Sequence, residues 1–386
     1  MKKVLSSLVL CFLAFALLLC GTQTYSLQAS AETELLINSK SALLMEYDSG
    51  EILFAKNEKE HLPVASMVKM MTILIALEEL EAGNVNLDTK ITTTENASSM
   101  GGSQVFLDPY VDYSFEELLK SVIMASANDA SVALAEYFNG NENAFVNRMN
   151  RKAKELGMTD THYANCTGLP APEQYSSAKD SAILLKEIVK HDVYHKFSTI
   201  WIDELVHPSG RKTELVNTNR LIRYYQGCDG GKTGSTNEAG CCLGASAKRG
   251  DMRLVAVILG AQNSKTRFNE TASLFNYGFA NFESQKLVDC EQAVANISVS
   301  KGKKDVVDVY AQESFSAVMK KCDKSGYETV LKVEQKISAP AKAGEKVGEI
   351  VVVRNGNEIK KIPVILKEDL KALSWFETAQ KILKNW

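Results

Sequence analysis

A serine and a lysine stand three residues apart where a helix is expected to begin. In residues 63–69, P-V-A-S-M-V-K, this spacing puts the Ser66 hydroxyl and the Lys69 amine on one helix face, within reach of each other. A serine hydroxyl is a poor nucleophile until a neighbouring base takes its proton, and a buried lysine can be that base if its amine is neutral. Ser66 and Lys69 are therefore a candidate nucleophile and base, although S-x-x-K alone is a common pattern.

A second polar pair, Ser126-Ala-Asn128, follows the helical pattern that begins near Ser114, at a break in its periodicity. A hydroxyl and an amide two residues apart can both project into one cleft from a short connection. The alternative is an ordinary turn between two helices, since S-x-N is also a common pattern. The pair is therefore informative only together with its neighbours in the chain.

The third motif, G-K-T-G-S at residues 231–235, introduces an expected strand. Lys232 offers a cation and Thr233 a hydroxyl along a strand edge, a combination suited to binding a carboxylate. A phosphate-binding P-loop is excluded, because that motif needs glycine where Gln226 stands and a helix after its lysine. The motif therefore predicts recognition of a carboxylate.

The order and separation of S-x-x-K, S-x-N and K-T-G match the motif set of the penicillin-binding proteins and class A β-lactamases. More closely, the chain resembles the low-molecular-mass D-alanyl-D-alanine carboxypeptidases of peptidase family S11 over essentially its full length. Residues 165–169 (N-C-T-G-L) and 175–180 (Y-S-S-A-K-D) also resemble the loop that flanks the active site in that family. The resemblance implies a β-lactamase/transpeptidase-like catalytic domain, in which an antiparallel sheet carries helices on its faces.

The resemblance further implies a covalent mechanism. Ser66 attacks the D-Ala-D-Ala peptide carbonyl, Lys69 takes its proton, and Ser126 relays a proton to the leaving D-alanine. The backbone N–H groups of Ser66 and Ser235 form an oxyanion hole, in which each donor contributes about 3 kcal/mol. Water then hydrolyses the acyl-enzyme, and no metal or organic cofactor is required.

The substrate and the residues that hold it are also implied by the resemblance. The substrate is a peptidoglycan stem peptide ending in D-Ala-D-Ala, and β-lactam antibiotics act as covalent inhibitors. Asn128 holds the substrate and the catalytic amine, while Lys232 and Thr233 bind the terminal carboxylate. Gly234 and Ser235 complete the substrate-binding set.

Two other functions remain open. A class A β-lactamase usually carries Asp between the Ser and Asn of S-x-N, where this chain has Ala127, and usually lacks an additional β domain. A non-hydrolytic penicillin-binding or sensing protein is disfavoured because all the polar side chains of the three motifs are present. A histidine-based triad has little support, since none of the 5 histidines stands in a matching motif.

The N-terminus is typical of an export signal. Lys2 and Lys3 precede an apolar run at residues 4–19 and an A-x-A site at residues 29–31, which predicts a signal peptide, residues 1–31, cleaved after Ala31. The run is short for a membrane span, although an uncleaved anchor is the alternative. We expect the mature chain at the outer face of the bacterial cytoplasmic membrane or in the cell wall. Disulfides can form there, but their pairing cannot be deduced among Cys166, Cys228, Cys241, Cys242, Cys290 and Cys322.

Composition and pattern indicate an ordinary globular chain. Its 386 residues carry 44 Lys+Arg and 47 Asp+Glu, a net charge of −3, with 45% hydrophobic residues. A low-complexity chain and a general nucleic-acid binder are therefore disfavoured. Within residues 32–284, strand patterns at 41–54 and 240–262 enclose a series of helices, and a further helix follows at 267–282. Strands from both ends of this region are expected to share one sheet with helices packed on it, so the predicted fold class is α+β.

Beyond residue 284 the strand patterns become short and evenly spaced, which predicts a small β-sandwich-like domain at residues 285–366 with a hairpin turn at 354–357. Residues 367–386 predict an amphipathic helix. We expect this helix to lie on a membrane surface, and the alternative is packing against the β domain. Its apolar stripe consists of Leu370, Leu373, Phe376, Ala379, Ile382, Leu383 and Trp386.

Overall fold

The computed structural model describes residues 35–321 and 326–384. The predicted signal peptide lies outside the described residues, as do Cys322 and Trp386. One hydrophobic core is built from residues between Leu43 and Leu259, and another from residues between Val288 and Leu370. The domain boundaries predicted at 284/285 and 366/367 stay predictions.

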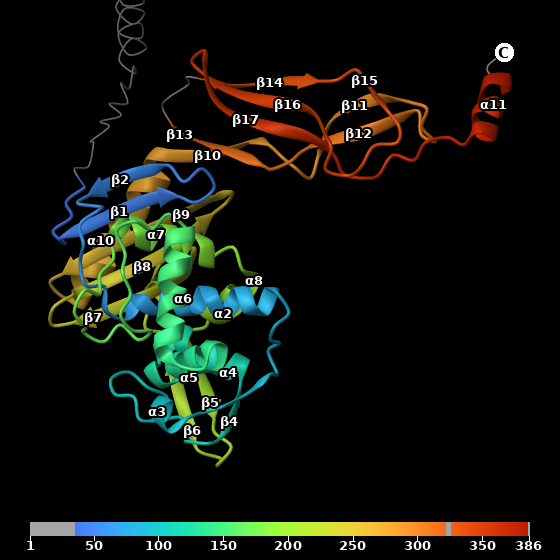
Figure 1. The fold of residues 1–386 in the computed structure, drawn as a ribbon. Helices are drawn as coiled ribbons and strands as arrows, with labels where there is room; N and C mark the ends of the chain where they lie inside the picture. The colour runs from blue at the N-terminus through green and yellow to red at the C-terminus, as the bar shows by residue number, and fades with distance from the viewer. Residues whose placement is uncertain (1–34, 322–325, 385–386) are drawn as a thin grey trace, which may run out of the picture. The chain divides into compact units, whose positions relative to one another are not determined.

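The first core surrounds a five-stranded sheet with the strand order β2-β1-β9-β8-β7, in which every neighbouring pair is antiparallel (Figure 1). Both hairpins predicted from the sequence are confirmed, because β1 pairs with β2 and β8 pairs with β9. Strands from the two ends of this region meet where β1 pairs with β9. The strand bounds are Ser41–Glu46 (β1), Ile52–Lys56 (β2), Cys228–Thr236 (β7), Gly240–Arg249 (β8) and Met252–Ala261 (β9).

Successive residues of β1 face different helical layers, as the twofold periodicity of a strand requires. Leu43 and Met45 belong to the core that helices α2, α4, α5 and α7 share. Leu44 points the other way and reaches Gly278 of α10. All of β1 is buried. The sheet is therefore covered on both faces, which confirms the predicted α+β arrangement.

The helices expected at the S-x-x-K motif and near Ser114 are present. The helix that carries Ser66 and Lys69 begins as a 3-10 turn, η1, which continues directly into α2. Ser114 and Glu117 cap the start of α4 reciprocally, so the polar start of that helix is a capping box. The bounds are Ala65–Val68 (η1), Lys69–Glu81 (α2), Glu95–Ser98 (α3), Phe115–Met124 (α4), Asn128–Asn139 (α5), Glu142–Glu155 (α6), Ala178–Ile188 (α7), Asp192–Ser198 (α8), Leu221–Tyr224 (α9) and Ser264–Asn281 (α10).

Two small antiparallel sheets have no counterpart among the predicted elements. One pairs β3 (Lys90–Thr92) with β4 (Asp112–Ser114), and the other pairs β5 (Ile202–Val206) with β6 (Lys212–Val216). Each strand of the β5–β6 hairpin buries a single residue. The hydrophobic alternation that marks a strand in a sequence is therefore too weak to see there.

The second core belongs to an all-β region, as predicted. A six-stranded sheet has the order β14-β16-β17-β12-β11-β15, and β10 pairs separately with β13. The turn predicted at 354–357 is confirmed, because Arg354 of β16 pairs with Asn357 of β17. The bounds are Phe282–Val288 (β10), Ala293–Ser300 (β11), Val306–Ala311 (β12), Phe315–Lys320 (β13), Tyr327–Val333 (β14), Lys336–Ser338 (β15), Lys346–Arg354 (β16) and Asn357–Leu366 (β17).

The C-terminal helix, α11, spans Trp375–Lys384 and is shorter than the helix predicted from residue 367. Ser374 explains its start, since the Ser374 hydroxyl accepts from the Glu377 N–H and the Glu377 carboxylate accepts from the Ser374 N–H. Leu370 is only 4% exposed and belongs to the core of the β region. Its predicted place on the apolar stripe is therefore wrong, because this side chain already has an apolar environment.

Trp375 and Phe376, by contrast, are 85% and 66% exposed. Along the part of the chain that the structure describes, no helix combines the length and the apolar character that crossing a bilayer needs.

Candidate active site

Ser66 and Lys69 lie together at the junction of η1 and α2. Lys69 is fully buried, and its Nζ lies 3.1 Å from Ser66 Oγ and 2.5 Å from the carbonyl oxygen of Thr167. Burial lowers the pKa of Lys69 to about 7, although nearby Cys166 and Asp129 act in the opposite direction. A substantial fraction of this amine is therefore neutral near pH 7 and can accept a proton from the serine.

Ser126 lies in the connection between α4 and α5, where its φ of 62° is in the left-handed region that non-glycine residues seldom occupy. Its hydroxyl accepts a hydrogen bond of 2.7 Å from Lys232 Nζ. Burial lowers the pKa of Lys232 well below its ordinary value, and the positive charges of Lys69 and Arg267 lower it further. S-x-N and K-T-G are thus joined by a direct contact.

Asn128 begins α5, and its backbone N–H donates to the Ser103 carbonyl at 2.7 Å. Its side-chain Nδ2 donates to the Gly101 carbonyl at 2.6 Å, and its buried Oδ1 has no hydrogen-bond partner among the described residues. The contact with the Lys69 amine that the resemblance implies is not among the hydrogen bonds of the described chain. Asn128 instead holds a second segment, residues 101–103, beside the motif.

K-T-G lies within β7, the last strand of the sheet, so one edge of β7 pairs with no other described strand. This unpaired edge faces the turn that carries Ser66. Gly234 shows how close the approach is, because a Cβ there would lie 2.3 Å from the Val64 carbonyl oxygen and 3.2 Å from the Met67 nitrogen. Only glycine allows this approach. The predicted position of the motif on a strand edge is confirmed.

The three motifs border one cavity of about 650 Å³. Five predicted site residues line it directly, namely Ser66, Ser126, Thr233, Gly234 and Ser235. Lys69 and Lys232 lie behind this surface and reach it through their contacts with Ser66 and Ser126. The other lining residues are Ser103, Trp201, Val216, Asn217, Thr218, Arg220, Tyr224, Ser264 and Arg267.

Two arginines of the cavity escaped prediction. Arg267, in the first turn of α10, donates to the Gly234 carbonyl at 3.0 Å and to the Cys242 carbonyl at 3.3 Å. Arg220 lines the cavity just before α9. Neither residue belongs to a motif, and Arg267 reaches K-T-G only because α10 packs on β8 and β9. Their guanidinium groups make this end of the cavity cationic, as binding of a carboxylate requires.

Known proteins resemble the chain in sequence along both regions. The family model described as D-alanyl-D-alanine carboxypeptidase, peptidase S11, matches residues 28–263. D-alanyl-D-alanine carboxypeptidase DacF of Bacillus subtilis is 40% identical over 388 residues, which cover 100% of this chain and 99% of the relative. The chain belongs to the S11 family of D-alanyl-D-alanine carboxypeptidases. The model for the C-terminal domain of penicillin-binding protein 5 matches residues 282–372 of the carboxypeptidase.

Solved structures agree with this assignment. Penicillin-binding protein 5 of Haemophilus influenzae is similar with a TM-score of 0.71 and 31% identity, over 87% of this carboxypeptidase and 98% of that chain. A peptidoglycan synthesis regulatory factor of Streptococcus pneumoniae, PBP3, is similar with a TM-score of 0.72 and 26% identity, over 87% and 100% of the two chains. The chain is thus a serine-type carboxypeptidase rather than a class A β-lactamase or a sensing protein.

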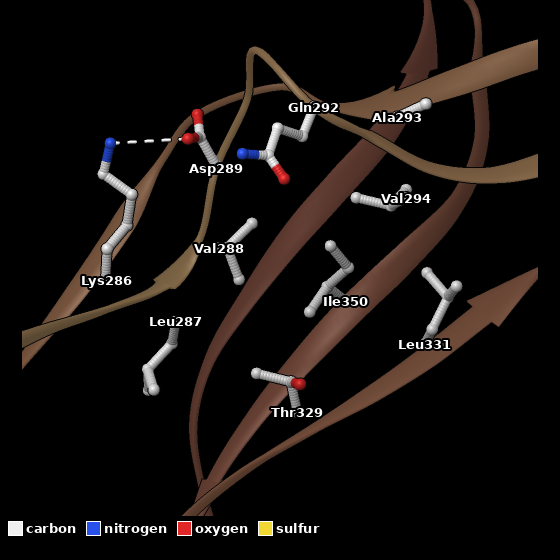
Figure 2. A pocket seen from close by; sticks show the side chains of 10 residues that line it. All are labelled: Lys286, Leu287, Val288, Asp289, Gln292, Ala293, Val294, Thr329, Leu331 and Ile350. Atoms are coloured by element: carbon white, nitrogen blue, oxygen red, sulfur yellow. Dashed lines mark hydrogen bonds and ion pairs between the residues drawn. The ribbon is translucent and has the colours of Figure 1, made fainter.

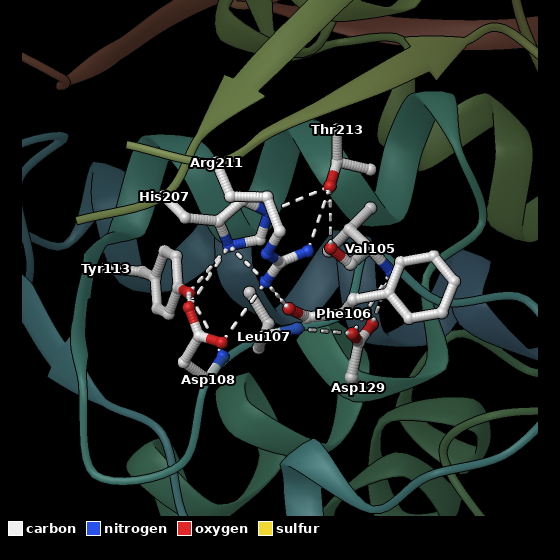
Figure 3. Close-up of polar contacts among 9 residues, drawn as sticks. All are labelled: Val105, Phe106, Leu107, Asp108, Tyr113, Asp129, His207, Arg211 and Thr213. Carbon is white, nitrogen blue, oxygen red and sulfur yellow. Dashed lines mark hydrogen bonds and ion pairs between the residues drawn. The ribbon is translucent and has the colours of Figure 1, made fainter. Parts of the chain in front are cut away.

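A polar network behind the cavity holds the S-x-N segment of the carboxypeptidase in place (Figure 3). Asp129, next to Asn128, is buried and accepts from the N–H groups of Val105 and Leu107 at about 3.1 Å. From the β5–β6 hairpin, Arg211 donates to the Phe106 carbonyl. Residues 105–107, which follow the segment that meets Asn128, are therefore fixed from two sides.

His207 completes this network from the loop of the β5–β6 hairpin. Its Nδ1 accepts from Arg211 at 3.1 Å, so Nε2 carries the proton and donates to Thr213 Oγ1 at 2.8 Å. Burial, reinforced by Arg211, lowers the pKa of His207. The histidine therefore stays neutral and structural at neutral pH, away from the reacting groups.

A second cavity of about 410 Å³ lies in the all-β region (Figure 2). Its wall combines apolar side chains such as Leu331 and Ile350 with an ion pair of 3.4 Å between Lys286 and Asp289. It carries no serine, cysteine or histidine that could act as a nucleophile.

The described residues contain no cluster of His, Cys, Asp and Glu able to hold a metal ion. Six cysteines were expected in the mature chain. Cys322 lies outside the described residues, and the other five are free thiols.

Proposed function

We propose that this carboxypeptidase removes the terminal D-alanine from peptidoglycan stem peptides through an acyl-enzyme on Ser66. The observation that carries the proposal is the 3.1 Å separation between Ser66 Oγ and the fully buried Lys69 Nζ, at the wall of a cavity with a cationic end. The nucleophile with its base and a site for a carboxylate thus border one cavity.

The acylation step balances its protons within the three motifs. Ser66 attacks the carbonyl of the last peptide bond, and its proton passes to the neutral Lys69 amine. Ser126 hands a proton to the nitrogen of the departing D-alanine and takes one from the Lys69 ammonium, so both groups regain their starting protonation. Its contact with Lys232 at 2.7 Å keeps its hydroxyl in place. Water then attacks the ester, releasing the shortened peptide and restoring the Ser66 hydroxyl.

Binding groups surround the reacting carbonyl. Lys232 and Thr233 hold the terminal carboxylate, with Arg267 adding positive charge beside Gly234. The backbone N–H groups of Ser66 and Ser235 stabilise the oxyanion. Asn128 binds the substrate backbone through its unpartnered Oδ1. A β-lactam that presents a carbonyl and a carboxylate at the same separation acylates Ser66 and inhibits the enzyme.

The rate of acylation should fall at acidic pH with a midpoint near the Lys69 pKa of about 7. Below that pH the amine is an ammonium ion with no lone pair for the serine proton, so the reactive fraction drops about tenfold per pH unit. The second-order rate of labelling by a fluorescent penicillin, measured across pH, gives this midpoint. A flat profile between about pH 5 and pH 9 would exclude Lys69 as the base.

We also propose that the mature enzyme works outside the cytoplasm and lies on a membrane through α11. The support is the exposure of Trp375 and Phe376, neighbouring aromatic side chains at the start of this helix. Residues 367–386 carry four lysines and three acidic residues, so apolar contact must supply most of the attraction.

Replacing Trp375 and Phe376 together with alanine should strongly reduce binding of the mature protein to anionic vesicles, whereas raising the salt concentration should reduce it only partly. Vesicle sedimentation measures both effects, and Gln380→Ala, an exposed polar position on the same helix, is the matched control. A chain ending at Ser374 keeps Leu370 in its core and should retain peptidase activity. Equal vesicle binding by this shortened chain and the complete mature chain would show that α11 does not bind the membrane.

A further inference from the structure

The Lys69 amine is positioned by one backbone carbonyl, that of Thr167, outside the three motifs. This carbonyl accepts from Lys69 Nζ at 2.5 Å and is buried with it. When the amine is neutral, donation of one N–H to Thr167 leaves its lone pair to be directed toward Ser66. The position of the segment at residues 164–169, which we call the lysine loop, therefore decides how well Lys69 can act.

Two side-chain amides hold the lysine loop in its shape. Asn165 Oδ1 accepts from the N–H groups of Thr167 at 3.2 Å and Gly168 at 2.7 Å, and Asn165 Nδ2 donates to the Leu169 carbonyl at 2.9 Å. These bonds close a tight turn around the carbonyl that meets Lys69.

Gln174 joins the two ends of the same loop. Its Oε1 accepts from the N–H groups of Ala164 and Asn165, each at 3.0 Å, and its Nε2 donates to the Leu169 carbonyl at 3.0 Å. Nε2 also lies 3.3 Å from Asn165 Oδ1, so the two amides contact each other. One glutamine thus serves three backbone groups of the lysine loop, which is too short and irregular to satisfy them with its own backbone.

The lysine loop also contacts helices α2 and α5. The Cys166 carbonyl accepts from Ser131 Oγ of α5 at 2.8 Å and from Thr72 Oγ1 of α2 at 3.3 Å. At Gly168 a Cβ would lie 2.1 Å from the Ala65 carbonyl oxygen and 2.8 Å from the Ser66 nitrogen. A displacement of the loop would therefore change the positions of both Ser66 and Lys69.

We propose that Asn165 and Gln174 are positioning residues of the reaction. They hold the Thr167 carbonyl against Lys69, and so exclude water from the amine and orient it toward Ser66. The inference rests on the proposed function of Lys69 as the base. Neither side chain needs to touch the substrate. Loss of either amide should admit water to the amine, stabilise its ammonium form and slow acylation.

The test compares Gln174→Met and Asn165→Ala with the unmodified mature protein in penicillin labelling across pH. We expect each variant to acylate about tenfold more slowly at pH 7 and the acidic midpoint to move to higher pH, since hydration favours the ammonium ion. Gln174→Glu retains both acceptor contacts of Oε1 and loses the donations of Nε2 to the Leu169 carbonyl and to Asn165 Oδ1, so its rate should lie between those of Gln174→Met and the unmodified protein. Glu173→Gln, an exposed neighbour in the same turn, is the matched control and should leave rate and midpoint unchanged.

Unchanged rates in Gln174→Met and Gln174→Glu would overturn the proposal, and so would a slower rate with an unmoved midpoint, which indicates general structural damage. If Gln174→Met does not fold, Gln174→Glu carries the test alone. These results are distinct from failure of the proposed function, which would appear as absence of Ser66 labelling in the unmodified protein.

Discussion

Ser66→Ala should abolish both the release of D-alanine and covalent labelling by a fluorescent penicillin, while the protein remains folded. Without the hydroxyl there is no acyl-enzyme, and loss of a serine nucleophile costs on the order of 10⁶-fold in rate in serine peptidases. The side chain is small and partly exposed at the cavity wall, so its removal leaves the buried core intact. Labelling followed on a gel and D-alanine release in solution measure the two losses independently.

Ser264→Ala provides the matched control for this experiment. Ser264 lines the same cavity but has no hydrogen bond to a lysine among the described residues, and it belongs to no motif. This variant should label and hydrolyse like the unmodified protein. Penicillin attached to a serine other than Ser66, identified by mass spectrometry of the Ser66→Ala protein, would contradict the assignment of the nucleophile.

Lys232→Ala should lower kcat/KM for the peptide by about 10²- to 10³-fold. The substitution removes the fully buried Lys232 amine from the carboxylate site and also leaves the Ser126 hydroxyl without its donor. Truncating one partner of a desolvated charged contact costs about 2–5 kcal/mol. Lys232→Arg should be milder, because it keeps the positive charge although its planar shape differs from that of an ammonium ion.

The substrate provides the complementary change for this second prediction. A peptide whose C-terminal carboxylate is amidated should lose most of its rate with the unmodified enzyme, and the Lys232→Ala variant should discriminate far less between acid and amide. If the unmodified enzyme cleaves the amide as well as the acid, Lys232 does not anchor the carboxylate.

Local patterns predicted the parts of this site that depend on nearby residues. The three-residue spacing on a helix was enough to bring Ser66 beside Lys69, and the strand pattern was enough to place Lys232 at a sheet edge. Contact between K-T-G and S-x-N, by contrast, spans 106 positions of the chain and was available only from the resemblance.

Other features depend on tertiary packing and leave no pattern in the sequence. Arg267 reaches Gly234 because α10 packs on the sheet, and Thr167 reaches Lys69 because two amides fold the lysine loop. The start of α11 was predicted too early, since the apolar spacing of Leu370 fits a helix while its side chain fills the β core. A periodic pattern shows that a residue needs an apolar environment and does not show which one.

The central claim is tested most directly by steady-state release of D-alanine from diacetyl-L-Lys-D-Ala-D-Ala by the mature protein. We predict many turnovers, with one D-alanine released per peptide, and complete inhibition once one penicillin is bound covalently to Ser66 in each molecule. Rapid hydrolysis of the penicillin with no cleavage of the peptide would indicate a β-lactamase. Stoichiometric penicillin binding with no release of D-alanine would indicate a non-hydrolytic binding protein, and either result would contradict the proposed function.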